Sequence, residues 1–243
     1  VNYTADTFEK KAGDKIALQR QLGLHENADA PIIAMVTRLN SQKGLDLVER
    51  VLAEIMSTGA QMVVLGMGES KYEDLFNWAQ WKYAGQLSAT FQMNHELSHR
   101  IYAGADMYLM PSMFEPCGLS QLISLRYGTL PIVRETGGLR DTVLSYNEYT
   151  GEGNGFSFLN YNAHDMLHVI ERAVRYYKTE RETWVTLMRR AMRGKYGWDQ
   201  SAHQYVSLYE NLLAPPPPEK KKRAPRKKAE TVENSEEAKP AAK

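Results

Sequence analysis

The sequence predicts an α/β fold built on a doubly wound parallel sheet, and two observations carry this prediction. Short apolar runs alternate with longer amphipathic stretches between residues 31 and 158, which is the pattern of repeated strand–helix units. Glycine-rich or polar loops separate the runs, as expected where a strand turns into a helix. Parallel strands need a crossover between them, so the repeats indicate one parallel sheet covered by helices.

The strands are expected where the runs are short, mostly apolar and bounded by glycine, proline or charge. Five of them are buried and a shorter sixth follows, at 32–36, 62–65, 87–91, 107–110, 131–133 and 155–158.

Helices are expected where apolar residues recur every three or four positions. One pattern runs from Leu45 to Met56 and ends near Gly59, and another runs from Leu119 to Gly128. Three more helical stretches follow the last strand. They span about 162–178, 180–194 and 199–213, and the last places Tyr205, Leu208, Tyr209 and Leu212 on one face.

Composition limits the class of protein. The chain has 243 residues, is 43% hydrophobic and has a net charge of +1. Its tail, 215–243, carries nine basic and five acidic residues, so the remainder is slightly acidic and is not expected to bind nucleic acid. A single cysteine excludes an internal disulfide and fits a reducing cytoplasm. No apolar run approaches the roughly 18 residues of a membrane span, and no signal peptide is evident.

The chain divides into four expected parts. Residues 1–30 form a connecting segment, 31–197 form the α/β domain, 198–214 form a C-terminal helix and 215–243 form a tail. The tail opens with four prolines, continues with a lysine and arginine cluster and has no aromatic residue. Such a segment buries too little apolar area to offset its ordering entropy, so we expect it to be disordered.

Ligands of open parallel sheets bind beyond the carboxyl ends of the strands, so the loops there hold the candidate site. After the first strand, Arg38 and Lys43 lie five residues apart before a helix. Together with helix-start amides they are suited to a diphosphate, although a solvated basic loop has the same composition. After the second strand, Gly66-Met67-Gly68 either lines a nucleotide pocket or forms a tight turn.

The loop after the fourth strand is the most informative. It carries Glu115 and then Pro116, Cys117, Gly118, Leu119 and Ser120. Proline restricts the glutamate to an extended backbone, and glycine lets a ligand approach the amides that follow. Cys117 is interpreted as a small packing residue. After the fifth strand, Thr136, Gly137 and Gly138 again open a helical segment.

A zinc site is the alternative for one segment. His95-Glu96-Leu97-Ser98-His99 matches the H-E-x-x-H pattern of zinc proteases, with Glu115 as a nominal third ligand. This pattern lies in a crossover between strands, and Glu115 already belongs to the glycine-rich loop. We therefore expect no metal.

Several of these blocks together resemble the bacterial glycogen synthases and plant starch synthases. They are the runs at 38–46, 98–101, 104–107, 111–119, 136–142 and 198–205. The string from Glu115 to Leu119, with Lys43 in its own loop, is the most specific part. The likeness extends from about residue 3 to 213.

The resemblance implies the C-terminal, Rossmann-like domain of a glycosyltransferase of the GT-B architecture, in which two such domains face a cleft. Its bacterial members transfer glucose from ADP-glucose to the non-reducing end of an α-1,4-glucan, with retention and without a metal or cofactor. By this likeness 31–197 is the donor-binding domain. The helix at 198–214 is expected to pack on an N-terminal domain that this chain lacks.

The resemblance also implies roles for single residues. Arg38 and Lys43 would hold the distal phosphate, and Glu115 would contact the hydroxyls of the donor glucose. The segment from Cys117 to Ser120 would bind sugar and phosphate. Some members stack an aromatic ring on the adenine near the position of Met93, and a methionine side chain is also able to pack on a base. A binding module that holds nucleotide or glucan without catalysis is the second hypothesis.

Overall fold

The computed structural model describes residues 2–213, which belong to two compact units. The first unit extends to Tyr196, and the second begins at Gly197. Of the second unit the structure describes α9 (Trp198–Leu213). In that helix Tyr205 and Tyr209 lie one turn apart, with ring centroids separated by 6.2 Å. The disorder predicted for 215–243 lies outside the described residues.

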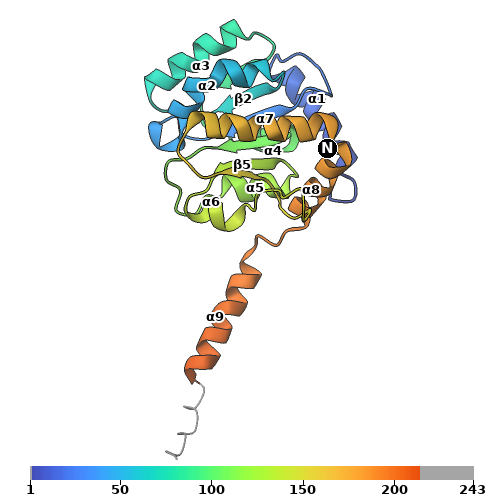
Figure 1. Cartoon of the computed structure of the whole chain (residues 1–243), viewed down its shortest axis with the longest axis vertical. Helices are drawn as coiled ribbons and strands as arrows, with labels where there is room; N and C mark the ends of the chain where they lie inside the picture. Colours follow the sequence, from blue (N-terminus) through green and yellow to red (C-terminus); the bar gives the residue numbers. More distant parts are fainter. Residues whose placement is uncertain (1, 214–243) are drawn as a thin grey trace, which may run out of the picture. The chain divides into compact units, whose positions relative to one another are not determined.

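A six-stranded parallel sheet forms the centre of the first unit (Figure 1). The strand order is β3-β2-β1-β4-β5-β6, so the chain builds outward in both directions from β1 and β4. The strands are β1 (Ile32–Val36), β2 (Gln61–Leu65), β3 (Leu87–Thr90), β4 (Met107–Met110), β5 (Leu130–Arg134) and β6 (Phe156–Phe158). The doubly wound sheet is therefore confirmed, and each predicted strand forms within one residue of its expected ends.

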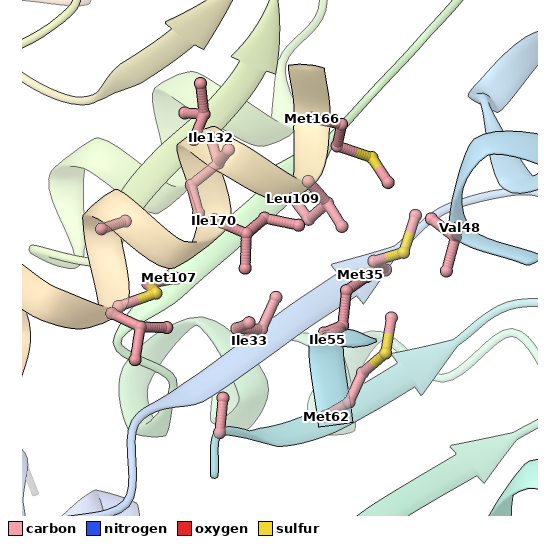
Figure 2. Packing of buried hydrophobic residues seen from close by; sticks show 14 of the residues in the cluster. Ile33, Met35, Val48, Ile55, Met62, Met107, Leu109, Ile132, Met166 and Ile170 are labelled. Atoms are coloured by element: carbon pink, nitrogen blue, oxygen red, sulfur yellow. The ribbon is translucent and has the colours of Figure 1, made fainter. Parts of the chain in front are cut away.

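The strand side chains alternate between two apolar clusters, one on each face of the sheet. Helices cover both of these clusters. Ile33 and Met35 point into the larger cluster, whereas Ile32 and Ala34 point into the smaller one. The larger cluster is covered by α2 (Leu45–Ser57), α3 (Ser70–Lys82), α7 (Ala163–Thr179) and α8 (Arg181–Arg193). The smaller is covered by α1 (Lys11–Gln21), α4 (His95–Gly104) and α6 (Gly137–Thr142). Figure 2 shows part of the larger cluster, where Met35, Ile55 and Ile170 come from three different elements.

The short helix α5 (Ser120–Arg126) follows β4 and packs against α8. Its predicted end is also confirmed, since Gly128 follows it with a φ of 66°. No helix among residues 2–213 is long and apolar enough to cross a membrane.

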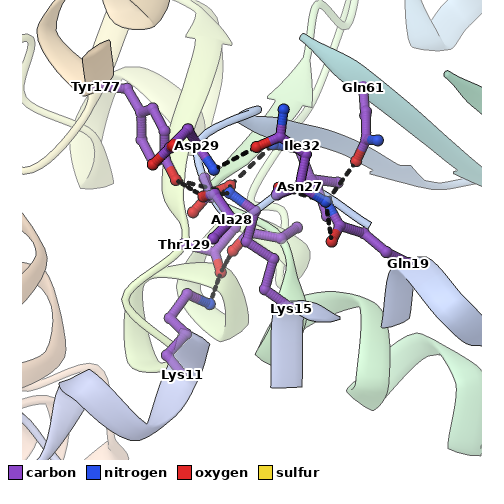
Figure 3. Close-up of polar contacts among 12 residues, drawn as sticks. Lys11, Lys15, Gln19, Asn27, Ala28, Asp29, Ile32, Gln61, Thr129 and Tyr177 are labelled. Carbon is purple, nitrogen blue, oxygen red and sulfur yellow. Dashed lines mark hydrogen bonds and ion pairs between the residues drawn. The ribbon is translucent and has the colours of Figure 1, made fainter. Parts of the chain in front are cut away.

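The connecting segment contains a helix that the sequence patterns did not indicate. After a short 3₁₀ turn, η1 (Phe8–Lys10), the helix α1 packs against α4 within the first unit. Its inward face is polar, because Lys11, Lys15 and Gln19 are all buried. These side chains contact groups near the amino ends of the strands (Figure 3).

Each buried lysine of α1 has several partners. Lys15 Nζ forms an ion pair of 2.9 Å with Asp106 and donates to the Tyr177 hydroxyl at 2.6 Å. Lys11 Nζ donates to the Ala103 carbonyl at 2.7 Å and to Thr129 Oγ1 at 2.9 Å. Burial lowers the pKa of Lys11 to about 7. This network holds α1 as part of the domain.

Candidate functional site

The sheet itself creates the opening in which the candidate site lies. β1 and β2 pair along all five residues of β1, but β1 and β4 pair only at Ile33–Met107 and Ala34–Tyr108. The two central strands therefore separate toward their carboxyl ends. This is also the point at which the strand order reverses direction, the position where open α/β sheets bind ligands.

Tyr108 occupies the gap that this separation leaves. Its hydroxyl donates to the Val36 carbonyl at 2.7 Å and accepts from the Val36 N–H at 3.2 Å. The tyrosine thus replaces the ladder bonds that a neighbouring strand would have supplied. Burial raises the pKa of Tyr108, so its hydroxyl stays protonated. Sequence reasoning missed this residue, and its only signal is a tyrosine inside a buried apolar strand.

The centre of the site is an ion pair between the two predicted loops. Lys43 Nζ lies 2.6 Å from Glu115 Oε2, and the two side chains are 16% and 12% exposed. Ser112 Oγ also donates to Glu115 Oε2, at 3.3 Å. The pair lines a cavity of about 60 Å³ between the ends of β1 and β4. Gly118, Leu119 and Ser120 line the same cavity.

Local backbone geometry places the lysine. Lys43 ends a 3₁₀ turn, η2 (Ser41–Lys43), whose first N–H groups are capped by Asn40; the Asn40 side chain accepts from the Lys43 N–H at 3.2 Å. Gly44 follows with a φ of 74°. A Cβ at Gly44 would lie 2.1 Å from the Pro111 carbonyl oxygen. The Lys43 turn and the Glu115 loop are therefore in close backbone contact at a position that accepts only glycine.

A second, larger cavity adjoins the first. It measures about 370 Å³ and is lined by Arg38, Gly66, Met67, Met93 and His95, among others. Val36 and Thr37 line both cavities, which therefore share a wall. The structure thus brings Arg38, Gly66 and Met93 together, although they follow three different strands. Met93 is 86% exposed, so its side chain is accessible to a ligand.

The third predicted glycine turn lies behind the Glu115 loop. The Gly138 N–H donates to the carbonyls of Glu115 and Pro116, at 3.2 and 3.1 Å. A Cβ at Gly138 would lie 2.3 Å from the Cys117 carbonyl oxygen. In this structure Gly138 therefore supports the loop, and its amide is already occupied. Thr136 occupies the N-cap position of α6 without a side-chain capping hydrogen bond, and Gly137 is the first residue of that helix.

One interpretation of the loop is wrong. Cys117 was expected to be a packing residue, but its side chain is exposed. The reason is that Gln121 fills the space behind the loop, where its Nε2 donates to the carbonyls of Cys117 and Gly118 at 2.9 and 3.0 Å.

The two histidines of the H-E-x-x-H pattern have other surroundings. His95 lines the larger cavity, and His99 Nδ1 lies 3.0 Å from the Tyr127 hydroxyl. Glu115 is paired with Lys43. Among residues 2–213 no group of three or more metal-binding side chains is present.

Together these features define the chemistry that the site accommodates. An ammonium group suits an anion, and a carboxylate accepts hydrogen bonds from hydroxyl groups. The adjoining cavity, with its exposed methionine, suits a flat ring. The fold and the site therefore define a Rossmann-like α/β domain, with a polar ligand site at the carboxyl edge of its sheet.

The chain belongs to the family described as glycosyl transferases group 1, whose match spans residues 20–185. It is 54% identical over 211 residues to a glycogen synthase of Bacillus cereus, which covers 87% of this chain and 44% of the relative. It is 56% identical over 211 residues to a glycogen synthase of Geobacillus thermodenitrificans, covering 87% of this chain and 43% of that protein. The chain thus spans less than half the length of these curated relatives.

Solved structures agree with this assignment. The catalytic domain of starch synthase IV from Arabidopsis thaliana, bound to ADP and acarbose, superposes with a TM-score of 0.80 at 33% identity. That match covers 87% of this chain and 44% of the plant chain. A sucrose-phosphate synthase from Thermosynechococcus elongatus shares the fold, with a TM-score of 0.59 at 23% identity over 80% of this chain and 48% of that chain.

Proposed function

We propose that this chain is the donor-binding half of a glycogen or starch synthase. The whole protein would transfer glucose from ADP-glucose to the non-reducing end of an α-1,4-glucan with retention of configuration. The observation that carries the proposal is the Lys43–Glu115 pair at the point where β1 and β4 separate. The relatives named glycogen synthase, and the starch synthase bound to ADP and acarbose, support it.

The two adjoining cavities would receive different parts of a nucleotide sugar. The larger one, with Gly66 and Met93, would receive the adenine. Lys43 and Arg38 would bind the distal phosphate, and Glu115 would accept hydrogen bonds from the glucose hydroxyls. Gly118 to Ser120 line the cavity where sugar and phosphate meet. Cys117 and the turn from Thr136 to Gly138 would complete the loop around the donor.

The reaction needs little covalent chemistry from these residues. The bond between glucose C1 and the diphosphate oxygen breaks, and the acceptor hydroxyl forms a new bond on the same face of the sugar. The departing diphosphate oxygen takes the proton of that hydroxyl. Lys43 and Arg38 would stabilise the negative charge that develops on the diphosphate, while the pocket holds the reacting atoms in place.

The remaining partners belong to the whole protein. The glucan would bind in a cleft whose second wall is an N-terminal domain, and α9 would pack on that domain through its apolar face. The proposed site of action is the cytoplasm, which the single cysteine favours.

The test is glucose transfer from ADP-glucose to glycogen. We expect transfer by the intact protein and none by the 243-residue chain alone, because the chain supplies one wall of the cleft. Sequencing the coding region upstream of Val1 shows whether an N-terminal domain is encoded. If the intact protein binds ADP and glucan yet transfers no glucose, the second hypothesis, a binding module without catalysis, replaces this one. Glucose transfer by the 243-residue chain alone would contradict the proposal that this chain supplies only the donor-binding half.

A further inference from the structure

The two charged residues of the site lie on segments that have little regular structure of their own. Lys43 ends a three-residue 3₁₀ turn, and Glu115 lies in the irregular loop between β4 and α5. Their ion pair is short and mostly buried. Besides the backbone contact between Gly44 and Pro111, side chains from other parts of the molecule hold these two segments.

Met113 is the first point of support, two residues before Glu115. Its N–H donates to the Gln42 carbonyl at 2.9 Å, which joins the Glu115 loop directly to the Lys43 turn. Its carbonyl accepts from Arg134 Nη1 at 2.8 Å. Arg134 is the last residue of β5, so a side chain of the neighbouring strand holds the loop from behind.

Tyr161 provides the second support. The Arg134 guanidinium carbon lies 5.5 Å from the centroid of the Tyr161 ring, within the range of a cation–π contact. The Tyr161 hydroxyl donates to Asp46 Oδ1 at 2.5 Å. It also lies 3.4 Å from the Ser41 carbonyl, the first residue of the Lys43 turn. Burial and the nearby Asp46 raise the pKa of Tyr161, so the hydroxyl remains a donor.

These contacts close a circuit. From the Lys43 turn it passes to Glu115, back along the loop to Met113, and across to Arg134. It then continues through Tyr161 to Asp46, in the first turn of the helix that follows Lys43. The circuit draws on the last residue of β5 and on the segments that follow β1, β4 and β6. Neither Arg134 nor Tyr161 lines the two cavities.

We propose that Arg134 and Tyr161 are positioning residues that hold in place the two backbone segments that carry Lys43 and Glu115. The role as a donor site rests on the proposed function; the circuit itself does not. In a sugar diphosphate the distance between the phosphate and the sugar hydroxyls is fixed by covalent bonds. A site that binds both ends with charged groups gains from holding the backbone segments that carry those groups in place before the ligand arrives, so that only the two side chains have to part.

The first experiment needs no ligand. Amide hydrogen exchange is measured residue by residue in the chain and in Tyr161→Phe, which removes the hydroxyl and keeps the ring beneath Arg134. We expect the amides of Lys43 and Met113 to exchange about threefold to tenfold faster, the effect of losing one hydrogen bond on local opening. Tyr176→Phe is the matched control, because that hydroxyl donates to Glu148 at 2.7 Å away from the site. It should leave both amides unchanged.

The second experiment measures ADP and adenosine binding by calorimetry. Tyr161→Phe is expected to weaken ADP binding several-fold and to leave adenosine binding unchanged, because only the phosphates contact Lys43. In a Lys43→Ala background the same substitution should have no further effect on ADP. A purely structural role would instead lower both affinities together, or lower the thermal stability alone.

The outcomes distinguish a failure of the positioning role from a failure of the proposed function. Unchanged exchange at Lys43 and Met113 in Tyr161→Phe overturns the positioning role. Faster exchange in Tyr161→Phe, together with no ADP binding by the wild-type chain, keeps the circuit and rejects the proposed function. If Tyr161→Phe lowers the ADP affinity of the wild-type chain and of Lys43→Ala by the same factor, the positioning role is overturned even when the exchange rates change.

Discussion

At the scale of single residues, the Lys43–Glu115 pair explains how two mostly buried charges are accommodated at the site. A mostly buried charge without a partner is costly, and each residue here satisfies the other at 2.6 Å. A ligand that enters between them has to supply replacements. In the proposed function a phosphate would replace the carboxylate beside Lys43, and sugar hydroxyls would replace the ammonium beside Glu115. A nucleotide diphosphate without its sugar would satisfy only Lys43 and would leave Glu115 facing a phosphate.

This asymmetry predicts the effect of Glu115→Gln. The amide keeps the shape of the carboxylate but removes its charge, so we expect free ADP to bind several-fold more tightly to the variant chain. In the intact protein, glucose transfer should fall by about a hundredfold or more, the scale of losing a charged contact to the transition state. Calorimetry with ADP and the transfer assay measure the two effects.

Glu135→Gln serves as the control for Glu115→Gln. It removes a carboxylate at the same edge of the sheet, where Glu135 accepts from Ser157 Oγ at 2.7 Å. ADP affinity that is identical in the wild-type and Glu115→Gln chains would show that the carboxylate does not face the phosphates.

Sequence reasoning at this scale predicted residues that the structure gathers around the two cavities, but not the residues that hold them in place. Lys43, Glu115, Arg38 and Gly66 follow strands, and the rule for parallel sheets places strand ends together. Tyr161 and Tyr108 act through hydroxyl groups whose partners are distant in the chain. The Tyr161 hydroxyl donates a hydrogen bond to Asp46, which lies 115 residues away in the sequence. No local pattern marks such a pair.

At the scale of elements, Gly44 is the joint between the Lys43 turn and α2. Its positive φ and its contact with the Pro111 carbonyl both exclude a side chain. The same contact places the Lys43 turn against the Glu115 loop. We therefore expect Gly44 to affect both the stability of the domain and ligand binding.

Gly44→Ala is therefore expected to destabilise the domain by at least about 1 to 2 kcal/mol, the cost of a left-handed backbone for a residue with a side chain. It should also weaken ADP binding, because the two segments must move apart. Urea unfolding and calorimetry measure the two effects. Gly13→Ala is the control: it lies within α1 with no atom near its Cβ, and alanine there should stabilise the helix by up to about 1 kcal/mol. Equal stabilities of the two variants would contradict this account of Gly44.

The helix α1 shows where element prediction from sequence stops. Apolar periodicity reveals amphipathic helices, as it did for α2, α7 and α8. The buried face of α1 instead consists of Lys11, Lys15 and Gln19 around Leu18. A helix whose inward side chains are mostly polar or charged has the same sequence pattern as an exposed segment. For this reason the sequence indicated only a connecting segment at 1–30, where the structure has a helix that packs within the first unit.

Lys11 is expected to make the folding stability of the domain depend on pH. Its pKa is about 7 in the folded protein, against 10.5 for the free side chain. Between these values the unfolded chain binds a proton that the folded chain does not, so stability should rise with pH above 7. We expect a slope on the order of 1 kcal/mol per pH unit from this group. Below pH 7 the group should contribute no slope.

Unfolding by urea at pH 6, 7, 8 and 9 measures this slope. Lys11→Met should remove it, whereas Lys178→Met should retain it, because the Lys178 ammonium binds the Thr58 carbonyl at the surface. A slope that persists unchanged in Lys11→Met would show that another group is responsible.

At the scale of the whole molecule, the sequence predicted the parallel sheet, its doubly wound order and the edge that carries the site. These follow from repeated strand–helix units, which leave few topologies open. The partial pairing of β1 with β4 could not be predicted, because it depends on how Tyr108 substitutes for a strand. The chain spans less than half the length of its curated relatives.

The most direct test of the central claim is a calorimetric titration of the 243-residue chain with ADP. We predict binding at or below millimolar ADP, and a loss of about tenfold or more in affinity for Lys43→Ala, as expected for a charge-assisted contact. Lys71→Ala, which removes an exposed lysine paired with Glu49, should bind ADP like the wild-type chain. No binding at millimolar ADP, or an unchanged affinity in Lys43→Ala, would contradict the assignment of this site to a nucleotide sugar.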